Sequence, residues 1–391
     1  MRIAYVTETY PPEINGVSLT ADRCLRHLRA AGHQVQLLRP RQPGEEATDG
    51  ADEWRTPGGP IPMYPELRYG VAGVARLRRR WRRDGPAAPD LVHVTTPGPL
   101  SWAALRAARA EGLPTSADFR TNFHTYCHHY RLGWMEPLVV GYLRRLHAMA
   151  DQTFVPTPEL ATALRERGFE RLQVVGRGVD TQRFAPSRRC EALRQRWQAG
   201  PDDPVLLHVG RLAPEKNVEL ALQTAERLRA IRPNLRMVVV GNGPQRARLQ
   251  AAYPHVHFVG VQRDIELARH YASADLFLFP SLTDTFGNVT LEAMASGLAV
   301  VAFDTAAAAL HLHHGHSGWL AAPLPGSAGR ELFFDAARHA LAQWQPDSPL
   351  RQLAVQAATL ADWDAVLRGF EQRLRVLAAR PSTVSPHAAL A

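Results

Sequence analysis

The stretch LFLFPSLTDTFGNVTLEAMASGLAVVAF (276–303) is the strongest indicator of the fold. Its apolar beginning, 276–280, reads as a buried strand, and after a polar loop a short helix is expected over about 288–296. Gly297 is typical of a helix end, and residues 298–303 read as the next buried strand. A strand, a helix and a second strand in succession predict an α/β unit with a parallel sheet.

Two carboxylates flank the start of the predicted helix. Asp284 lies in the loop, and Glu292 lies in the second helical turn. The free N–H groups at a helix start attract an anion, above all a phosphate. A carboxylate one turn further on repels a phosphate, but it can accept hydrogen bonds from a ribose diol. The stretch therefore predicts a site for a nucleotide diphosphate sugar, and the alternative is an ordinary α/β unit whose acids face solvent.

Length and composition indicate a two-domain globular protein. The chain has 391 residues and is 45% hydrophobic, which suits two domains of about 180 residues each. It contains no apolar run long enough for a transmembrane helix, and MRIAYVTETYPP at the N-terminus lacks the apolar core of a signal peptide. Its three cysteines are scattered, which argues against a disulfide framework and for the reducing cytoplasm.

The net charge of +9 includes a cluster of six arginines between residues 76 and 83. Val74, Leu77 and Trp81 recur among them at helical spacing. The cluster reads either as a solvated helix face or as a patch that rests on anionic lipid, which would make the protein peripheral on the inner face of the membrane. Because no interleaved aromatic platform accompanies the arginines, we do not expect binding to nucleic acid.

The N-terminal residues predict a further βαβ unit. A strand is expected at 2–7, a helix at about 19–31 and a second strand at 35–40. Asn15 and Gly16 lie where the first loop turns into the helix, and glycine allows the backbone to approach a ligand closely. The absence of GxGxxG argues against a dinucleotide-dependent dehydrogenase.

Breaks in the alternation of strands and helices predict the domain organisation. Residues 41–70 are rich in proline, glycine and acids without a clear period, and they are expected to form a loop. After an irregular segment the pattern restarts near residue 204. We therefore predict an N-terminal domain over 1–178 and a C-terminal domain over 200–360, with helices within 350–379 that could return to the first domain.

Two groups of polar residues follow predicted strands, where open parallel sheets bind ligands. Arg120 and His124 follow one strand and are candidates to hold a sugar or its phosphate. Arg211 and Lys216 bracket the loop after the strand at 204–212, and Lys216 is the only lysine among 46 basic residues. A compact ammonium beside a guanidinium could clamp a diphosphate, and the alternative is a surface loop with two cations.

The histidine-rich segments are poor candidates for metal sites. Cys127, His128 and His129 are consecutive, which is unsuitable spacing for ligands on one helix. The tract HLHHGH (311–316) lacks nearby cysteine or carboxylate ligands and is typical of a helix end. We therefore expect no metal site.

Several motifs occur in the order that is typical of one enzyme family. INGVS (14–18), GVDTQRF (178–184), HVGRLAPEKN (208–217), VVGNGP (239–244) and the block 274–304 resemble signatures of the retaining glycosyltransferase family 4. The resemblance covers most of residues 1–320. SADFRTNFHTYCHHY (116–130) also resembles a segment of the bacterial GDP-mannose-dependent α-mannosyltransferases in that family. It implies the GT-B fold, in which two doubly wound Rossmann-like parallel-sheet domains face a central cleft.

The resemblance also implies residues that bind the donor. Glu292 would bind the donor ribose, Arg211 and Lys216 the diphosphate, and Gly16 would lie against the donor sugar and phosphate from the N-terminal domain. The further donor-binding residues implied by the match are Asn242, Thr285, Phe286, Gly287 and Asn288.

The catalytic side implied by the resemblance comprises His124, Arg120 and Asp284. Asp284 stands where the family's Glu-x7-Glu pattern has its first glutamate. Many relatives have a histidine where this chain has Arg120, so either Arg120 or His124 could fill that role. Thr305 and Ala306 replace a Gly-Gly pair that often follows the last strand, so contacts with the donor sugar could differ.

The expected reaction moves a hexose, mannose from GDP-mannose, to a hydroxyl of a lipid or glycan acceptor with retention of configuration. The resemblance implies neither a metal nor a cofactor. Two alternatives remain: a nucleotide-sugar hydrolase or epimerase on the same fold, which would turn over the donor without acceptor, and a non-catalytic nucleotide-sugar binding protein.

Overall fold

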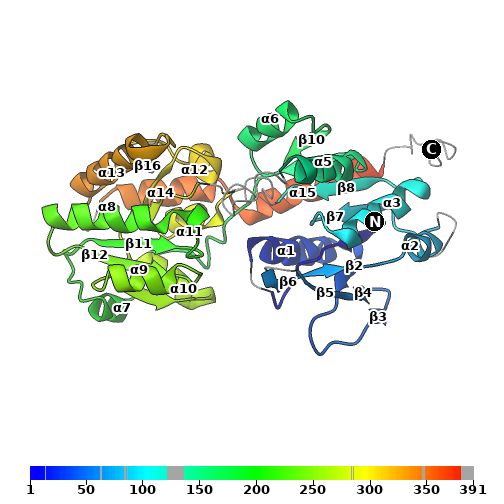
Figure 1. Ribbon diagram of the computed structural model, residues 1–391, viewed down its shortest axis with the longest axis horizontal. Coiled ribbons are helices and arrows are strands. Elements are labelled where there is room, and N and C mark those ends of the chain that lie inside the picture. The colour runs from blue at the N-terminus through cyan, green and yellow to red at the C-terminus, as the bar shows by residue number, and fades with distance from the viewer. Residues whose placement is uncertain are drawn as a thin grey trace. The chain divides into compact units, whose positions relative to one another are not determined.

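The described residues of the computed structural model divide into two units (Figure 1). The structure describes residues 1–13, 15–61, 64–82, 85, 87–120, 136–282, 284, 286–345 and 348–379, with residues 64–67 described by their backbone alone. The first unit contains the described residues up to Gly176 and those from Val366 onward, and the second contains Arg177–Ala365. The return to the first unit occurs within helix α15 (Trp363–Ala378).

The first unit is built on an eight-stranded sheet with the order β10-β9-β8-β7-β1-β2-β4-β3. Neighbouring strands are parallel, except for the short pair β3 and β4. The order reverses between β1 and β7, so the sheet is doubly wound. The strands are β1 (Arg2–Val6), β2 (Gln34–Pro40), β3 (Thr48–Asp49), β4 (Glu53–Thr56), β7 (Leu91–Val94), β8 (Thr115–Asp118), β9 (Gln152–Val155) and β10 (Leu172–Val174).

Helices connect these strands and begin at residues suited to helix starts. Asn15 caps α1 (Gly16–Ala30), because its side-chain oxygen accepts hydrogen bonds from the backbone N–H groups of Val17 and Ser18 at 3.1 and 2.8 Å. Thr157 caps α6 in the same manner, with proline at the first helical position. The helices of this unit besides α15 are α1, α2 (Val74–Arg80), α3 (Pro99–Ala110), α5 (Glu136–Ala148) and α6 (Pro158–Glu166).

The prediction of a loop over 41–70 is wrong. This segment contains β3, β4 and an antiparallel pair, β5 (Gly58–Ile61) and β6 (Tyr64–Gly70). β3 and β4 are short and are the last two strands at one side of the sheet, and β5 and β6 form a separate two-stranded sheet, so none of them needs a continuous apolar run. Composition alone therefore gave no strand signal in this segment.

Arginines of α2 have carboxylate partners. Arg76 and Arg80 both pair with Asp49, and the Nε of Arg78 lies 2.9 Å from an oxygen of Glu111. These pairs are solvent-exposed and contribute little stability, on the order of 0–1 kcal/mol each. They do reduce the net positive charge that this helix presents.

The second unit contains a six-stranded, entirely parallel sheet with the order β13-β12-β11-β14-β15-β16. This is the 3-2-1-4-5-6 order of a Rossmann fold, and the order reverses between β11 and β14. The strands are β11 (Val205–Val209), β12 (Arg236–Val240), β13 (His257–Gly260), β14 (Leu276–Phe279), β15 (Ala299–Phe303) and β16 (Gly318–Ala321). The predicted strands of the stretch 276–303 are thus confirmed as β14 and β15.

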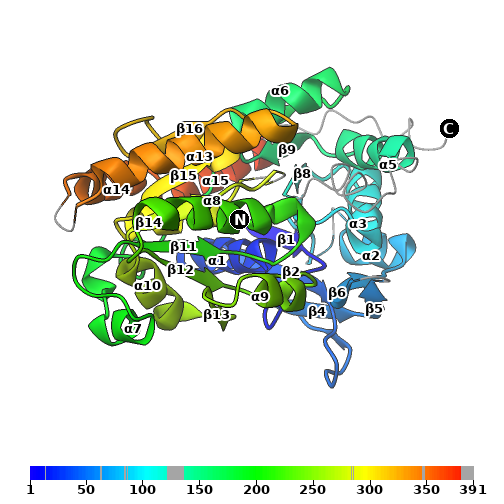
Figure 2. The same cartoon turned by 60° about the vertical axis from the view of Figure 1, so that its left-hand side comes forward.

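Helices cover both faces of this sheet. Successive strand residues point to opposite faces: Leu207 packs in a core with residues of α10, α11 and α14, whereas Leu206 packs in a core with residues of α8 and α13. Figures 1 and 2 show α8 and α13 side by side on one face. The helices are α7 (Glu191–Arg196), α8 (Val218–Ile231), α9 (Arg246–Ala252), α10 (Asp264–Ser273), α11 (Asn288–Ala295), α12 (Ala306–His311), α13 (Gly326–Gln343) and α14 (Leu350–Thr359).

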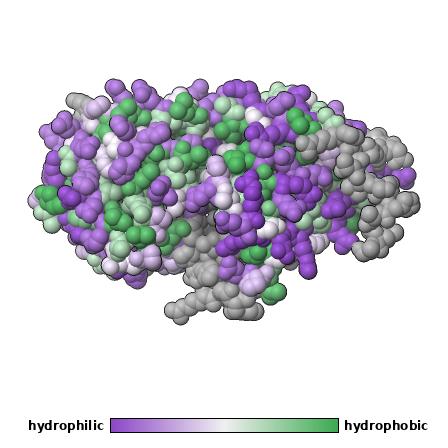
Figure 3. Space-filling model, turned by 90° about the horizontal axis from the view of Figure 1, so that it is seen from above, coloured by the Kyte–Doolittle hydropathy of each residue, from purple (hydrophilic) through white to green (hydrophobic). Residues whose placement is uncertain are grey.

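Within the described part of the chain, no helix has both the length and the apolar character needed to cross a bilayer. The face of the molecule in Figure 3 mixes hydrophilic and hydrophobic residues.

Candidate active site

The candidate site lies in the second unit, where the strand order reverses between β11 and β14. In open parallel sheets, ligands bind beyond the carboxyl ends of strands at such a reversal. The loop after β11 carries Arg211 and Lys216, and the loop after β14 carries Asp284. The topology therefore brings together residues that are about seventy positions apart in the sequence.

Two glycines of the GNGP turn pack the backbone of Asn242 against the loop after β11. The Leu212 N–H donates to the Asn242 carbonyl at 3.0 Å. A Cβ at Gly241 would lie 1.9 Å from the Gly210 carbonyl oxygen, and one at Gly243 would lie 2.4 Å from that of Leu212. Only glycine allows this approach, so these two residues fix the loop that carries the exposed Arg211.

Lys216 and Asp284 form an ion pair across the two loops. The Lys216 ammonium lies 2.6 Å from Oδ1 of Asp284, and both side chains are less than one-fifth exposed. The backbones of the loops are also joined, because the Leu282 N–H donates to the Glu215 carbonyl at 3.0 Å. The ammonium lies 5.6 Å from the centre of the Phe279 ring, within the range of a cation–π interaction.

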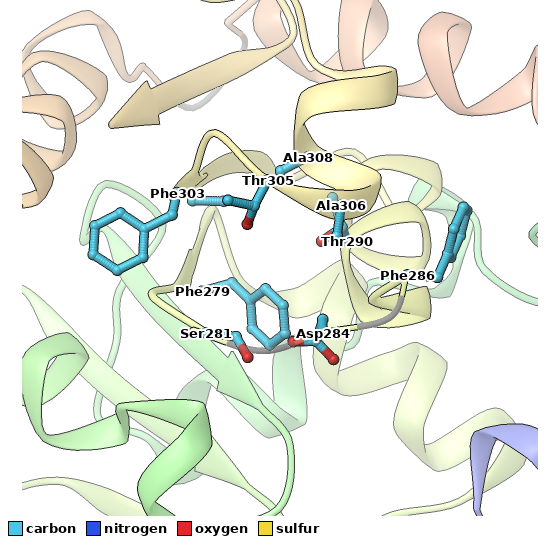
Figure 4. A pocket seen from close by; sticks show the side chains of 10 residues that line it. Phe279, Ser281, Asp284, Phe286, Thr290, Phe303, Thr305, Ala306 and Ala308 are labelled. Carbon is cyan, nitrogen blue, oxygen red and sulfur yellow. The ribbon is translucent and has the colours of Figure 1, made fainter. Parts of the chain in front are cut away.

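A small pocket adjoins this ion pair (Figure 4). Phe279, Ser281 and Asp284 line one side, and Thr305 and Ala306 line the opposite side. The Oδ2 atom of Asp284 is buried without a hydrogen-bond partner among the residues that the structure describes. A buried carboxylate oxygen without a partner is costly, so this atom is suited to accept a hydrogen bond from a ligand hydroxyl.

Helix α11 begins beside the pocket. Gly287 precedes it with φ of +88°, a left-handed conformation that favours glycine. Asn288, the first helical residue, accepts a hydrogen bond from the buried Arg177 at 3.4 Å, and the same guanidinium lies over the Phe286 ring. An arginine and the N-terminal end of a helix dipole thus contribute positive potential at this end of α11.

Glu292 lies one turn further along α11. Its Oε2 atom accepts a hydrogen bond from the hydroxyl of Tyr271, on α10, at 3.0 Å. Glu292 is half-buried, whereas Tyr271 is fully buried. The structure therefore gives the two acids different partners: Asp284 pairs with Lys216, and Glu292 accepts from a tyrosine.

His208 is a polar residue of this region that the sequence reasoning missed. It is fully buried in β11, and Nδ1 must donate to the Leu278 carbonyl, 2.9 Å away. Burial lowers its pKa to about 4, so the ring is neutral near pH 7. Nε2 is then an acceptor, and it has no hydrogen-bond partner within the described residues. The available signal was a histidine in an otherwise apolar strand directly before the Arg211 loop.

The first unit carries the remaining described candidates. Gly16 is the first residue of α1. Arg120 follows β8 and is only 10% exposed, and its guanidinium lies 2.6 Å from an oxygen of Asp118. Burial raises the pKa of Asp118, but the nearby Arg120 and His93 have a larger, opposite effect. The pKa is therefore lowered to about 2, and the carboxylate stays ionised. His124 and Thr285 lie outside the described residues.

The described residues contain no group of three histidine, cysteine or acidic side chains placed to hold a metal ion. In the tract 311–316, the Leu320 N–H donates to Nδ1 of His314 at 3.1 Å.

Comparison with known proteins identifies the family. A family model described as Glycosyltransferase Family 4 matches residues 14–183, and one described as Glycosyl transferases group 1 matches residues 203–341. A GDP-mannose-dependent alpha-mannosyltransferase of Mycobacterium tuberculosis is 38% identical over 312 residues, which cover 78% of this chain and 79% of the relative. The chain belongs to glycosyltransferase family 4. The resemblance inferred from the motifs is thereby confirmed.

A second relative agrees with the family 4 assignment, and a solved structure agrees with the fold. A protein of the same name from Mycolicibacterium smegmatis is 37% identical over 311 residues, which cover 78% of this chain and 80% of that relative. Sucrose-phosphate synthase from Thermosynechococcus elongatus superposes with a TM-score of 0.76 at 19% identity, covering 96% of this chain and 99% of that structure. The predicted GT-B fold with two doubly wound Rossmann-like domains is confirmed.

Proposed function

We propose that this glycosyltransferase moves mannose from GDP-mannose to a hydroxyl of a lipid or glycan acceptor with retention of configuration. The observation that carries the proposal is the meeting of Lys216 and Asp284 at the strand-order reversal of the second unit. The names of the two mycobacterial relatives support GDP-mannose as the donor. Neither a cofactor nor a metal takes part in the proposed reaction.

The donor diphosphate would bind at the carboxyl ends of β11 and β14. Its negative charge would meet the Lys216 ammonium, the Arg211 guanidinium and the N-terminal end of α11, which stabilise the leaving group as charge develops. When the donor binds, the Lys216 ammonium would leave Asp284 and contact the diphosphate instead. The released carboxylate would then accept hydrogen bonds from hydroxyls of the sugar, while Glu292 accepts those of the ribose.

Retention would follow from a front-face reaction. The bond between the anomeric carbon and the β-phosphate oxygen breaks, the acceptor oxygen bonds to the anomeric carbon on the same face, and the acceptor proton passes to the leaving phosphate. Arg120 and His124 would lie on the acceptor side of this reaction. The proposal needs no carboxylate nucleophile.

The acceptor would reach the enzyme in the cytoplasm, the reducing compartment that the scattered cysteines favour. We include peripheral contact with anionic lipid in the proposal, on account of the arginine-rich helix α2. Because three of its arginines pair with carboxylates, we expect this contact to be weak and sensitive to salt. Transfer measured on anionic and zwitterionic vesicles tests this part.

A panel of GDP-, UDP- and ADP-sugars, followed by thermal unfolding, tests the donor assignment. A ligand that binds the folded state raises the unfolding temperature, and the largest increase is expected for GDP-mannose, with the same increase in EDTA. A larger increase with a UDP-sugar would contradict the donor assignment. Rapid donor breakdown without acceptor would favour a hydrolase or epimerase, and binding without transfer to any lipid or glycan extract would favour a non-catalytic binding protein.

A further inference from the structure

Tyr271 is a fully buried residue to which neither the motifs nor the proposed mechanism gives a role. It belongs to α10, which precedes β14, whereas Glu292 belongs to α11, which follows β14. Both helices pack on the same face of the sheet and contact each other. The arrangement brings the phenol hydroxyl within 3.0 Å of Glu292 Oε2.

Two aromatic rings hold the Tyr271 ring in place. Phe184 meets it edge-on with ring centres 5.7 Å apart, and Phe277 of β14 lies at the same distance with a tilted ring. A ring clamped on two sides cannot move its hydroxyl freely. The hydroxyl is therefore held in one position, and its hydrogen bond restricts the more flexible side chain of Glu292.

Tyr271 acts as a hydrogen-bond donor. Burial, followed by the nearby charge of Glu292, raises the pKa of the phenol well above its usual value, so the hydroxyl keeps its proton. A carboxylate only accepts hydrogen bonds, which fixes the direction of the contact. A carboxylate has about four lone-pair sites, and the bond from Tyr271 orients the group while it uses one of them.

We infer that Tyr271 is a positioning residue that orients the Glu292 carboxylate toward the ribose hydroxyls of the donor nucleotide. The inference rests on the proposed function, in which Glu292 accepts hydrogen bonds from that ribose. Because Tyr271 is fully buried, its role would be to hold the carboxylate and not to touch the donor itself. A buried tyrosine also needs a partner for its hydroxyl, so its effect must be separated from simple stabilisation of the fold.

Calorimetric binding of GDP and of 2′,3′-dideoxy-GDP to the Tyr271→Phe variant distinguishes positioning of Glu292 from stabilisation of the fold. The substitution removes one oxygen and keeps the packing with Phe184 and Phe277. We expect GDP to bind about tenfold more weakly, the effect of losing one hydrogen bond to a charged group, whereas dideoxy-GDP binding changes less than twofold. Tyr253→Phe, on the other face of the sheet, is the matched control and should change neither affinity.

The outcomes distinguish the positioning role of Tyr271 from the assignment of Glu292 to the ribose. If Glu292→Gln abolishes the preference for GDP over dideoxy-GDP and Tyr271→Phe preserves it, the positioning role is overturned and the ribose assignment stands. If Tyr271→Phe weakens both ligands equally, the tyrosine is structural only, which also overturns the inference. If the preference survives in Glu292→Gln, the ribose assignment fails, and the role of Tyr271 fails with it.

Discussion

The Lys216→Ala variant is expected to transfer mannose about 10²–10³-fold more slowly than the wild type while the protein stays folded. Removal of one donor that stabilises developing charge typically has an effect of this size on kcat. The ammonium sits at the reversal of strand order, where its position is fixed by Asp284 and by the backbone contact between the two loops. Initial rates with radiolabelled GDP-mannose at saturating donor measure the change.

A second variant separates the loss of the ammonium from the exposure of its partner. Lys216→Ala leaves Asp284 without its counter-charge, and an unpaired carboxylate would repel the diphosphate. The double variant Lys216→Ala/Asp284→Asn removes this repulsion, so it should recover GDP affinity without recovering the rate. Arg227→Ala breaks the exposed pair with Glu331 in the same unit and is the matched control; its rate should stay within about twofold. A near-wild-type rate in Lys216→Ala would contradict the diphosphate assignment.

The Glu292→Ala variant is expected to lose about 10²–10⁴-fold in kcat/KM for GDP-mannose. Hydrogen bonds to a charged acceptor contribute about 1.5–3 kcal/mol each, and two ribose hydroxyls would lose theirs. Because the ribose does not react, the loss should appear mainly as a higher KM. This distinguishes Glu292 from Lys216, whose loss should appear in kcat.

Steady-state kinetics over a wide range of donor concentration measure this separation. Glu331→Ala, on the exposed surface of the same unit, is the matched control because it removes the same group away from the site. A KM for GDP-mannose within threefold of the wild-type value would contradict the ribose assignment. A fall in the unfolding temperature with an unchanged KM would instead indicate that the contact between Glu292 and Tyr271 mainly holds α10 to α11.

The sequence predicted the regular parts of both units because parallel α/β structure has a strong local signal. The strands β14 and β15 are continuous apolar runs, β11 is apolar except for His208, and glycines or capping residues mark several helix boundaries. The edge strands within 41–70 gave no such signal, because their pairing partners are distant in sequence and their faces are only partly buried. Propensity within a short window cannot report this kind of pairing.

For the site, the sequence indicated residues but not their contacts. Lys216 stood out as the only lysine, and Asp284 and Glu292 stood out by their spacing around a helix start. Lys216 and Asp284 meet because β11 and β14 are neighbours in the sheet. The sequence does not reveal this strand order directly. Tyr271 and His208 escaped notice because a tyrosine or histidine in an apolar segment has the same local pattern whether it packs or positions a ligand.

Retaining mannosyl transfer is tested most directly by transfer from radiolabelled GDP-mannose to lipid and glycan extracts, followed by NMR of the purified product. Extracts are presented on anionic and on zwitterionic vesicles, with Lys216→Ala as the inactive control. We predict acceptor-dependent formation of an α-mannoside, faster on the anionic vesicles at low salt. A β-mannoside, or GDP release at the same rate without any acceptor, would contradict it.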